Sequence, residues 1–129
     1  VIASGGGGIP VYNNSLGKLE GLDAVIDKDY SAAKMGRIIR AKELWIITDV
    51  DAVYENFGSS NQKRVSSMTT MEAEKLYDEG LFQKGSIAPK VRASIHFLKH
   101  HGNKVIITSI PRIEDALNGS AGTEIRNEA

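Results

Sequence analysis

Hydrophobic and polar positions along the chain form blocks whose period changes repeatedly. Short apolar runs of strand length lie at residues 1–3, 24–26, 43–48, 104–108 and 123–125. Longer stretches that predict helices lie between them, at residues 29–41, 69–80 and 89–102, and a short helix is predicted at 112–117. Strands that alternate with helices predict an α/β fold built on a mostly parallel sheet, with helices on both faces.

Specific residues mark several of the helix ends. Thr69 and Glu72 form a capping-box pattern, and Gly80 can end the helix that they begin. Pro89 suits the first turn of the next helix, which Gly102 ends. These residues set the limits of two predicted helices.

The first predicted helix and the longer connections are defined less sharply. We expect Asp29 to cap a helix that runs to about residue 41, with one apolar face made of Ala32, Met35, Ile38 and Ile39. Residues 11–21 are polar and rich in turn formers, which indicates a surface loop or a short hairpin. Residues 49–65 are expected to form a long polar loop.

Composition limits the kinds of protein that this chain can be. Its 129 residues suit one domain, 41% of them are hydrophobic, and the formal net charge is zero. A neutral chain gives no global electrostatic case for binding nucleic acid or an anionic membrane. Cysteine is absent, which excludes disulfides and thiolate metal sites, and the sequence has neither a membrane-spanning run nor a signal-peptide pattern. We therefore expect a cytoplasmic protein with no nucleic acid and no membrane among its partners.

A run of four glycines follows the first predicted strand. Because Gly5, Gly6, Gly7 and Gly8 lack Cβ atoms, an anion can approach the backbone and be held by successive N–H groups. The run matches neither the dinucleotide-binding fingerprint nor the P-loop, and a flexible turn is the alternative. Its position after a strand favours an anion site, since ligands of α/β sheets bind beyond the carboxyl ends of strands.

Two lysines lie where elements are expected to begin or end. Lys28, with Asp29 beside it, follows the apolar run at 24–26, and Lys90 follows Pro89 at a helix start. A lysine can hold phosphate as a point charge, a neighbouring carboxylate can fix its position, and a helix N-terminus favours anions. The alternative in both cases is a solvated surface lysine. Together with the glycine run, the lysines predict a site for phosphoryl transfer, which is catalysed mainly by positioning and charge neutralisation.

Other polar groups allow more than one interpretation. Asp49 and Asp51, after the run at 43–48, can form a metal pair, a nucleotide loop or a turn. His96 and His100 have the spacing of a metal-binding pair on a helix, but no carboxylate or cysteine completes a ligand set. We therefore expect surface histidines and assign no metal ligand.

Seven strings along the chain are similar to those of one known family. In order they are ASGGGGIPV at 3–11, AVIDKD at 24–29, TDVDAVY at 48–54, NQK at 61–63, GSIAPKV at 85–91, IITS at 106–109 and AGT at 121–123. They cover essentially the whole chain, and together they resemble the carbamate kinases of the amino acid kinase family. The aspartate-lysine-aspartate string and the glycine-glycine-isoleucine-proline loop favour that branch over the acetylglutamate, uridylate and aspartate kinases.

The resemblance implies both an architecture and a reaction. The architecture is a three-layer αβα sandwich with a mostly parallel sheet, in an enzyme that is a homodimer when complete. The reaction is the reversible transfer of a phosphoryl group between ATP and carbamate with Mg²⁺. In arginine catabolism it runs from ADP and carbamoyl phosphate toward ATP.

The resemblance also implies roles for particular residues. Lys28 and Lys90 would balance charge on the transferred phosphate, Asp29 would organise the two lysines, and the loop at 5–8 would lie beside the carbamate. The nucleotide pocket would be lined by Thr48, Asp49, Val50, Tyr54, Gly85, Ser86 and Ile87. Ile87 stands where the family usually has methionine, an apolar exchange of similar volume that we expect to be mild.

The chain departs from the family in its extent. It begins with Val1-Ile2-Ala3, a predicted strand already in progress without an initiator methionine, and the family's amino-terminal, substrate-binding half is absent. We expect residues 1–129 to be the carboxyl-terminal, nucleotide-binding portion of the fold, inactive or nearly so by itself. Two alternatives are a stand-alone nucleotide-binding module without activity and another amino acid kinase that acts on a different small acid.

Overall fold

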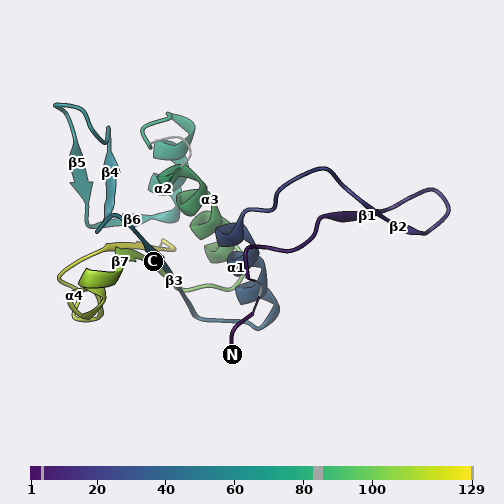
Figure 1. Ribbon diagram of the computed structural model, residues 1–129. Helices are drawn as coiled ribbons and strands as arrows, with labels where there is room; N and C mark the ends of the chain where they lie inside the picture. The colour runs from purple at the N-terminus through teal and green to yellow at the C-terminus, as the bar shows by residue number, and fades with distance from the viewer. Residues whose placement is uncertain (4, 83–85, 129) are drawn as a thin grey trace.

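The computed structural model describes residues 1–3, 5–82 and 86–128 (Figure 1). Its strands are β1 (Val11–Asn13), β2 (Leu19–Gly21), β3 (Glu43–Thr48), β4 (Val53–Glu55), β5 (Lys63–Val65), β6 (Ser67–Thr69), β7 (Lys104–Ser109) and β8 (Thr123–Arg126). Its helices are α1 (Lys28–Ile38), α2 (Thr70–Asp78), α3 (Ile87–Leu98), the 3-10 turn η1 (Ile110–Arg112) and α4 (Ile113–Leu117). None of the helices in these described residues is long and apolar enough to cross a membrane.

A four-stranded sheet with the order β3-β7-β8-β6 forms the centre of the molecule. β3 pairs with β7, and β6 with β8, in parallel, whereas β7 and β8 are antiparallel. Most of the pairings are thus parallel, which confirms the predicted α/β fold on a mostly parallel sheet. β6 was not predicted, because it is three residues long and buries a single apolar side chain, that of Met68.

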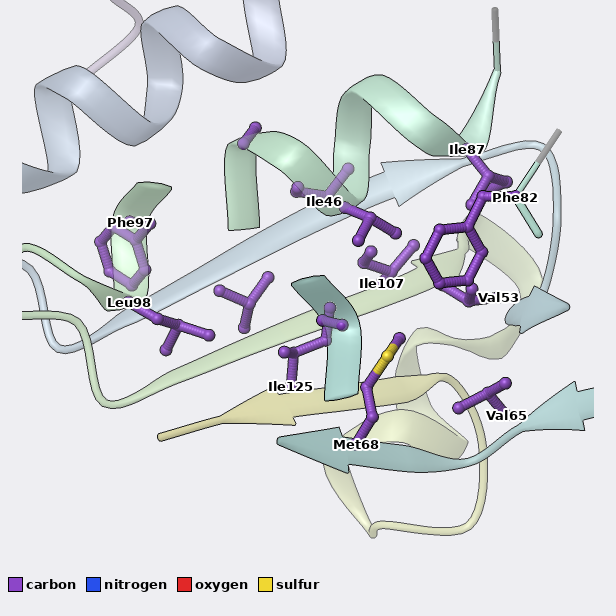
Figure 2. Packing of buried hydrophobic residues seen from close by; sticks show 14 of the residues in the cluster. Ile46, Val53, Val65, Met68, Phe82, Ile87, Phe97, Leu98, Ile107 and Ile125 are labelled. Carbon is purple, nitrogen blue, oxygen red and sulfur yellow. The ribbon is translucent and has the colours of Figure 1, made fainter. Parts of the chain in front are cut away.

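Helices cover both faces of the sheet because its central strand is apolar on both sides. Val105 and Ile107 of β7 belong to the main core cluster, with Phe97 of α3 and Ile125 of β8 (Figure 2). The intervening Ile106 is also buried, and it points to the opposite face, toward α4, since side chains alternate along a strand. The predicted three-layer αβα arrangement is confirmed.

The predicted limits of α2 are confirmed. The hydroxyl of Thr69 accepts a hydrogen bond from the backbone N–H of Glu72, and the Glu72 carboxylate accepts one from the backbone N–H of Thr69. Gly80 follows the helix with a positive φ of 71°. Both ends of α2 are therefore set by residues within its own sequence.

The end of α3 differs in detail from the prediction. The helix ends at Leu98, and the residue with a left-handed backbone beyond it is His101, with φ at 83°, rather than Gly102. Gly102 is required for another reason, because a Cβ atom there would lie 2.3 Å from the ring of Phe97.

The limits and the buried face of α1 also differ from the prediction. Asp27, not Asp29, is the N-cap, because its carboxylate accepts a hydrogen bond from the backbone N–H of Tyr30. Asp29 instead lies in the first turn, at the start of the buried face. The expected apolar face was wrong, since Ile38 and Ile39 are 80% and 68% exposed.

Two of the predicted strands are not strands in the described structure. Residues 1–3 and 24–26 have no strand pairing, and the side chains of Ile2 and Val25 are exposed. Both segments are apolar, but a segment becomes a strand only where a neighbouring strand pairs with its N–H and C=O groups. Within the described residues no such neighbour lies beside either segment.

Two hairpins project from the body of the molecule (Figure 1). β1 and β2 are antiparallel, which confirms the hairpin alternative for residues 11–21. β4 and β5 are also antiparallel, so the long polar loop predicted for residues 49–65 is wrong. Val53 and Val65, at the base of this second hairpin, are buried, and they anchor an otherwise polar segment to the core.

Candidate functional site

The starts of α1 and α3 bring Lys28, Asp29 and Lys90 together. The Nζ atom of Lys28 lies 3.2 Å from Oδ1 of Asp29, and that of Lys90 lies 3.1 Å from Oδ2 of the same carboxylate. The side chains of Asp29 and Lys90 are each 12% exposed, whereas that of Lys28 is 61% exposed. The interpretation of Lys90 as a solvated surface lysine is therefore wrong, and the ammonium group of Lys28 is accessible to a ligand.

Small residues let the two helices approach closely enough for this contact. Ala33 and Gly36 follow Asp29 on the buried face of α1, and this face packs against α3. A Cβ atom at Gly36 would lie 2.7 Å from the ring of Phe97 on α3. The packed surface between the two helices, which we call the α1–α3 seam, thus sets the position of Asp29 relative to Lys90.

Within the cluster of Lys28, Asp29 and Lys90, positive charge exceeds negative charge. One carboxylate is shared by two ammonium groups, and the N-terminal ends of α1 and α3, whose dipoles favour anions, lie at the same place. A group with several negative charges is attracted to such an arrangement. A phosphoryl group in transfer is one example, because its oxygens carry charge that has to be neutralised.

The glycine loop lies against the segment that leads into α1. A Cβ atom at Gly7, where φ is 135°, would lie 2.8 Å from the carbonyl oxygen of Ile26. Only glycine combines this backbone conformation with such a close approach. Cβ atoms at Gly5, Gly6 and Gly8 would meet open space. The structure therefore places the loop beside the start of α1, with room for a ligand around it.

The carboxyl end of β3 faces the start of α3. Thr48, the last residue of β3, donates its hydroxyl to Oδ1 of Asp49 at 2.9 Å. This hydrogen bond, the backbone N–H groups of Asp49 and Val50, and the charge of Lys90 hold the pKa of Asp49 below its ordinary value. The influence of Lys90 on Asp49 shows that the predicted nucleotide segment and the lysine site adjoin each other.

Tyr54 lies in β4, in the hairpin that follows this segment. Its hydroxyl donates to Oδ1 of Asp51 at 3.0 Å, and its ring meets that of Phe57 edge to face at 5.7 Å between centroids. Burial, and then the Asp51 carboxylate, raise the pKa of Tyr54. The described residues contain no group of three or more His, Cys, Asp or Glu side chains that could hold a metal ion.

Two further predicted nucleotide residues, Ser86 and Ile87, lie at the start of α3. Ser86 directly precedes the helix, and its side chain makes no capping hydrogen bond. Ile87 is buried in the same core cluster as Phe82 (Figure 2), so its backbone rather than its side chain can face a ligand. Gly85 lies outside the described residues.

The sequence did not reveal a cleft that adjoins this site. The cleft has a volume of about 690 Å³ and is lined by Ile26, Asp27, Tyr30, Tyr77, Ala88, Pro89 and Arg92. These residues come from α1, the segment before it, α2 and α3. No pattern local to one stretch of the chain could therefore predict the cleft.

His96 lies at the α1–α3 seam rather than on the open surface. Its Nδ1 atom is 3.4 Å from the hydroxyl of Tyr30, and the ring of His100 is 4.4 Å away between centroids. Its Nε2 atom is buried and has no hydrogen-bond partner in the described part of the chain. His96 is thus half-buried rather than fully exposed as expected, and its contact with Tyr30 could not be predicted because Tyr30 comes from a helix distant in sequence.

Known proteins are similar to this chain in both sequence and fold. Residues 1–109 match the model of the amino acid kinase family. The carbamate kinase of Halobacterium salinarum is 46% identical over 125 residues, which are 97% of this chain and 40% of that protein. The carbamate kinase of Thermoplasma acidophilum is 47% identical over 124 residues, which are 96% of this chain and 40% of that protein.

A solved structure gives the same result for the fold. The carbamate kinase from Giardia lamblia bound to AMP-PNP superimposes with a TM-score of 0.86 at 36% identity, over 95% of this chain and 43% of that one. The chain thus spans about 40% of the length of the relatives it matches.

Proposed function

This chain belongs to the amino acid kinase family, and on that premise we propose that the complete protein transfers a phosphoryl group reversibly between ATP and carbamate. The observation that carries the proposal is the carboxylate of Asp29, which holds the ammonium groups of both Lys28 and Lys90. The carbamate kinases among the relatives support the choice of substrate, and the Giardia lamblia enzyme bound to AMP-PNP supports an adenine nucleotide. The direction that we propose for the cell is ATP formation from ADP and carbamoyl phosphate, in arginine catabolism.

The proposed reaction exchanges one bond to phosphorus for another. The bond from phosphorus to the carbamate oxygen breaks, and a bond from the same phosphorus to a terminal phosphate oxygen of ADP forms. Charge on the transferred group must be balanced while both bonds are partial. Lys28, with its exposed ammonium, meets the phosphoryl group directly, and Lys90, held by Asp29, supplies a second charge whose position is already fixed.

The two substrates approach these lysines from different sides. The glycine loop at residues 5–8 receives the carbamate end, because it offers backbone N–H groups and open space beside the start of α1. The nucleotide lies along the carboxyl end of β3, the β4–β5 hairpin and the start of α3. The residues that we assign to it there are Thr48, Asp49, Val50, Tyr54, Ser86 and Ile87.

Mg²⁺ enters with the nucleotide in this proposal. It is usually bound through one or two carboxylates and the substrate's phosphates, and the described residues gather no group of three ligating side chains. Asp49 is exposed and its pKa is lowered, so it is the carboxylate at this edge that fits such a role. When bound, the metal adds charge neutralisation to that of the lysines.

We further propose that residues 1–129 are the carboxyl-terminal, nucleotide-binding portion of a cytoplasmic enzyme that acts as a homodimer. The chain spans about 40% of the length of its relatives. Phosphoryl transfer requires charge neutralisation around the whole transferred group. Residues 1–129 by themselves should therefore be inactive or nearly so.

A substrate panel with the complete protein tests the proposal. In the presence of ATP and Mg²⁺, ADP release should be fastest with carbamate and much slower with acetylglutamate, aspartate and uridylate. A preference for one of the other acceptors would place the protein in a different branch of the family. ADP binding in calorimetry without turnover of any acceptor would instead identify a nucleotide-binding module.

A further inference from the structure

The string AGT at residues 121–123 has no part in the proposed chemistry, yet its threonine is fully buried and bonded on both sides. The hydroxyl of Thr123 accepts a hydrogen bond from the backbone N–H of Val53 at 2.8 Å and donates one to the carbonyl oxygen of Val65 at 2.5 Å. Val53 and Val65 lie opposite each other in the β4–β5 hairpin. One hydroxyl on β8 thus holds both strands of the hairpin to the central sheet.

These two bonds act at the base of the hairpin. Val53 and Val65 form the pair farthest from the turn, and Tyr54 and Arg64 form the next pair. Both valines contribute to the core, as Figure 2 shows. Tyr54 directly follows Val53, so the orientation of the Val53 backbone decides where the Tyr54 side chain points.

The residue before Thr123 attaches the hairpin at a second point. The carbonyl oxygen of Gly122 accepts a hydrogen bond from Nη2 of Arg64 at 3.3 Å. Gly122 has a φ of 81°, and a Cβ atom there would lie 3.1 Å from the carbonyl oxygen of Ile107 in β7. Glycine therefore lets this turn lie close against the sheet. In that position the carbonyl group of Gly122 can accept the hydrogen bond from Arg64 of the hairpin.

We propose that Thr123 is a positioning residue for the nucleotide, which acts through the β4–β5 hairpin and touches no substrate itself. This inference rests on the proposed function, because it takes Tyr54 to be part of the nucleotide pocket. Without the hydroxyl, the N–H of Val53 and the carbonyl of Val65 lose their bonds to β8. The hairpin then loses its fixed orientation on the sheet, and Tyr54 moves with it.

Replacement of Thr123 by valine tests the role of the hydroxyl at nearly constant volume. In the complete protein we expect Thr123→Val to bind ADP about tenfold more weakly in calorimetry, which is the size of effect that loss of buried hydrogen bonds produces. The KM for ADP should rise as well, while the KM for carbamoyl phosphate stays unchanged. Thr123→Ser keeps the hydroxyl and should restore ADP binding.

Thr70, the first residue of α2, provides a matched control because it bonds to the opposite end of β8. It is also buried, and its hydroxyl donates to the carbonyl oxygen of Arg126 at 3.2 Å. Thr70→Val should lower the Tm without changing the Kd for ADP. If Thr123→Val shows that same pattern, its role is merely structural and the inference is overturned.

The design separates failure of this inference from failure of the proposed function. Wild-type protein that does not bind ADP contradicts both. If the wild-type protein and Thr123→Val bind ADP equally well, only this inference is contradicted. If Thr123→Val does not fold, Arg64→Met decides the matter, because Arg64 is exposed and the change removes its bond to Gly122. Weaker ADP binding with an unchanged KM for carbamoyl phosphate supports the inference, and unchanged ADP binding overturns it.

Discussion

Lys90 on α3 places its Nζ atom 3.1 Å from Oδ2 of Asp29 on α1, and both side chains are largely buried. Lys28 shares the same carboxylate but remains largely in solvent. The two lysines therefore differ in kind. The charge of Lys90 is fixed in place by its surroundings, and that of Lys28 is available to whatever enters the site.

Lys28→Ala should lower kcat about 10²–10³-fold, the usual effect of removing one preorganised electrostatic contact. The Tm should hardly change, because an ion pair with one exposed partner contributes little to stability. Steady-state kinetics in the ATP-forming direction and a melting curve measure the two effects. Lys99→Ala is the control, since Lys99 directly follows α3, is exposed and pairs with Glu74 of α2. Equal losses of kcat in the two variants would contradict the role of Lys28.

Lys90→Met should lower kcat and also destabilise the fold. Methionine keeps an aliphatic side chain of similar length, but it leaves the buried carboxylate of Asp29 with one ammonium partner instead of two. The loss of a buried partner costs about 1–3 kcal/mol in the free energy of unfolding. Urea denaturation of Lys90→Met and Lys28→Met tests this, and the second should change by less than about 0.5 kcal/mol. The opposite order of stabilities would show that Asp29 depends on Lys28 instead.

Gly36→Ala should destabilise the protein although it is a glycine-to-alanine change within a helix. Alanine normally stabilises a helix by about 1 kcal/mol relative to glycine. Here the new Cβ atom would lie 2.7 Å from one edge of the buried Phe97 ring, while Gly102 packs against the other edge. The ring cannot shift away, and overpacking of this kind costs about 1–3 kcal/mol. The clash therefore outweighs the gain in helix propensity.

Chemical denaturation of Gly36→Ala and of Gly21→Ala measures this difference. A Cβ atom at Gly21 would meet open space, so that variant should keep its stability to within about 0.5 kcal/mol. A Gly36→Ala variant more stable than the wild type would mean that the α1–α3 seam has room for a methyl group.

His96 predicts a loss of stability on mild acidification. Burial, and then the charges of Lys34, His100 and Arg37, lower the pKa of His96 below the ordinary value of 6.5. The titratable and charged groups around it are Tyr30, Lys34 and Arg37 on α1, Glu74, Tyr77 and Asp78 on α2, Arg92 on α3, and Lys99 and His100 directly after α3. The unfolded chain takes up a proton as the pH falls through 6.5, whereas the folded chain does so only at a lower pH. The free energy of unfolding should therefore decrease as the pH falls across that interval.

Denaturation at about pH 7.5 and about pH 5.5 brackets this interval, and ordinary carboxylates titrate below it. His96→Asn should reduce the loss of stability between the two conditions. His101→Asn is the control, because His101 is exposed and asparagine tolerates its positive φ. If His96→Asn loses as much stability as the wild type on acidification, His96 is not the group responsible.

Local interactions explain which parts of the fold could be predicted from the sequence. The capping box of Thr69 and Glu72 is made within four residues, so its pattern was sufficient. The strand predicted at residues 24–26 depended on a neighbour that apolar character cannot supply, and it was wrong. The β4–β5 hairpin was missed because its two buried residues, Val53 and Val65, are separated by a long polar turn.

The candidate site shows the same division. Lys28, Asp29 and Lys90 were identified by their residue types and their positions at element ends. The ion pair between Asp29 and Lys90, however, joins residues 61 positions apart, and it depends on the packing of two helices. The contact of Tyr30 with His96 spans 66 positions. A helical period places each of these residues on its own helix and says nothing about the helix that it meets.

β8 comes last in the sequence of the described strands, yet it lies in the interior of the sheet, between β7 and β6. Within the described residues β6 has no other partner in that sheet, and during translation it is synthesised more than 50 residues before β8. A ribosome that adds about 5–20 residues per second must therefore leave β6 unpaired for several seconds, and one edge of β7 for about 1–3 seconds. A nascent chain that stops before Thr123 presents these edges to other chains, which is a route to aggregation. The helices can form early during translation, but the sheet closes only when its latest strand is inserted.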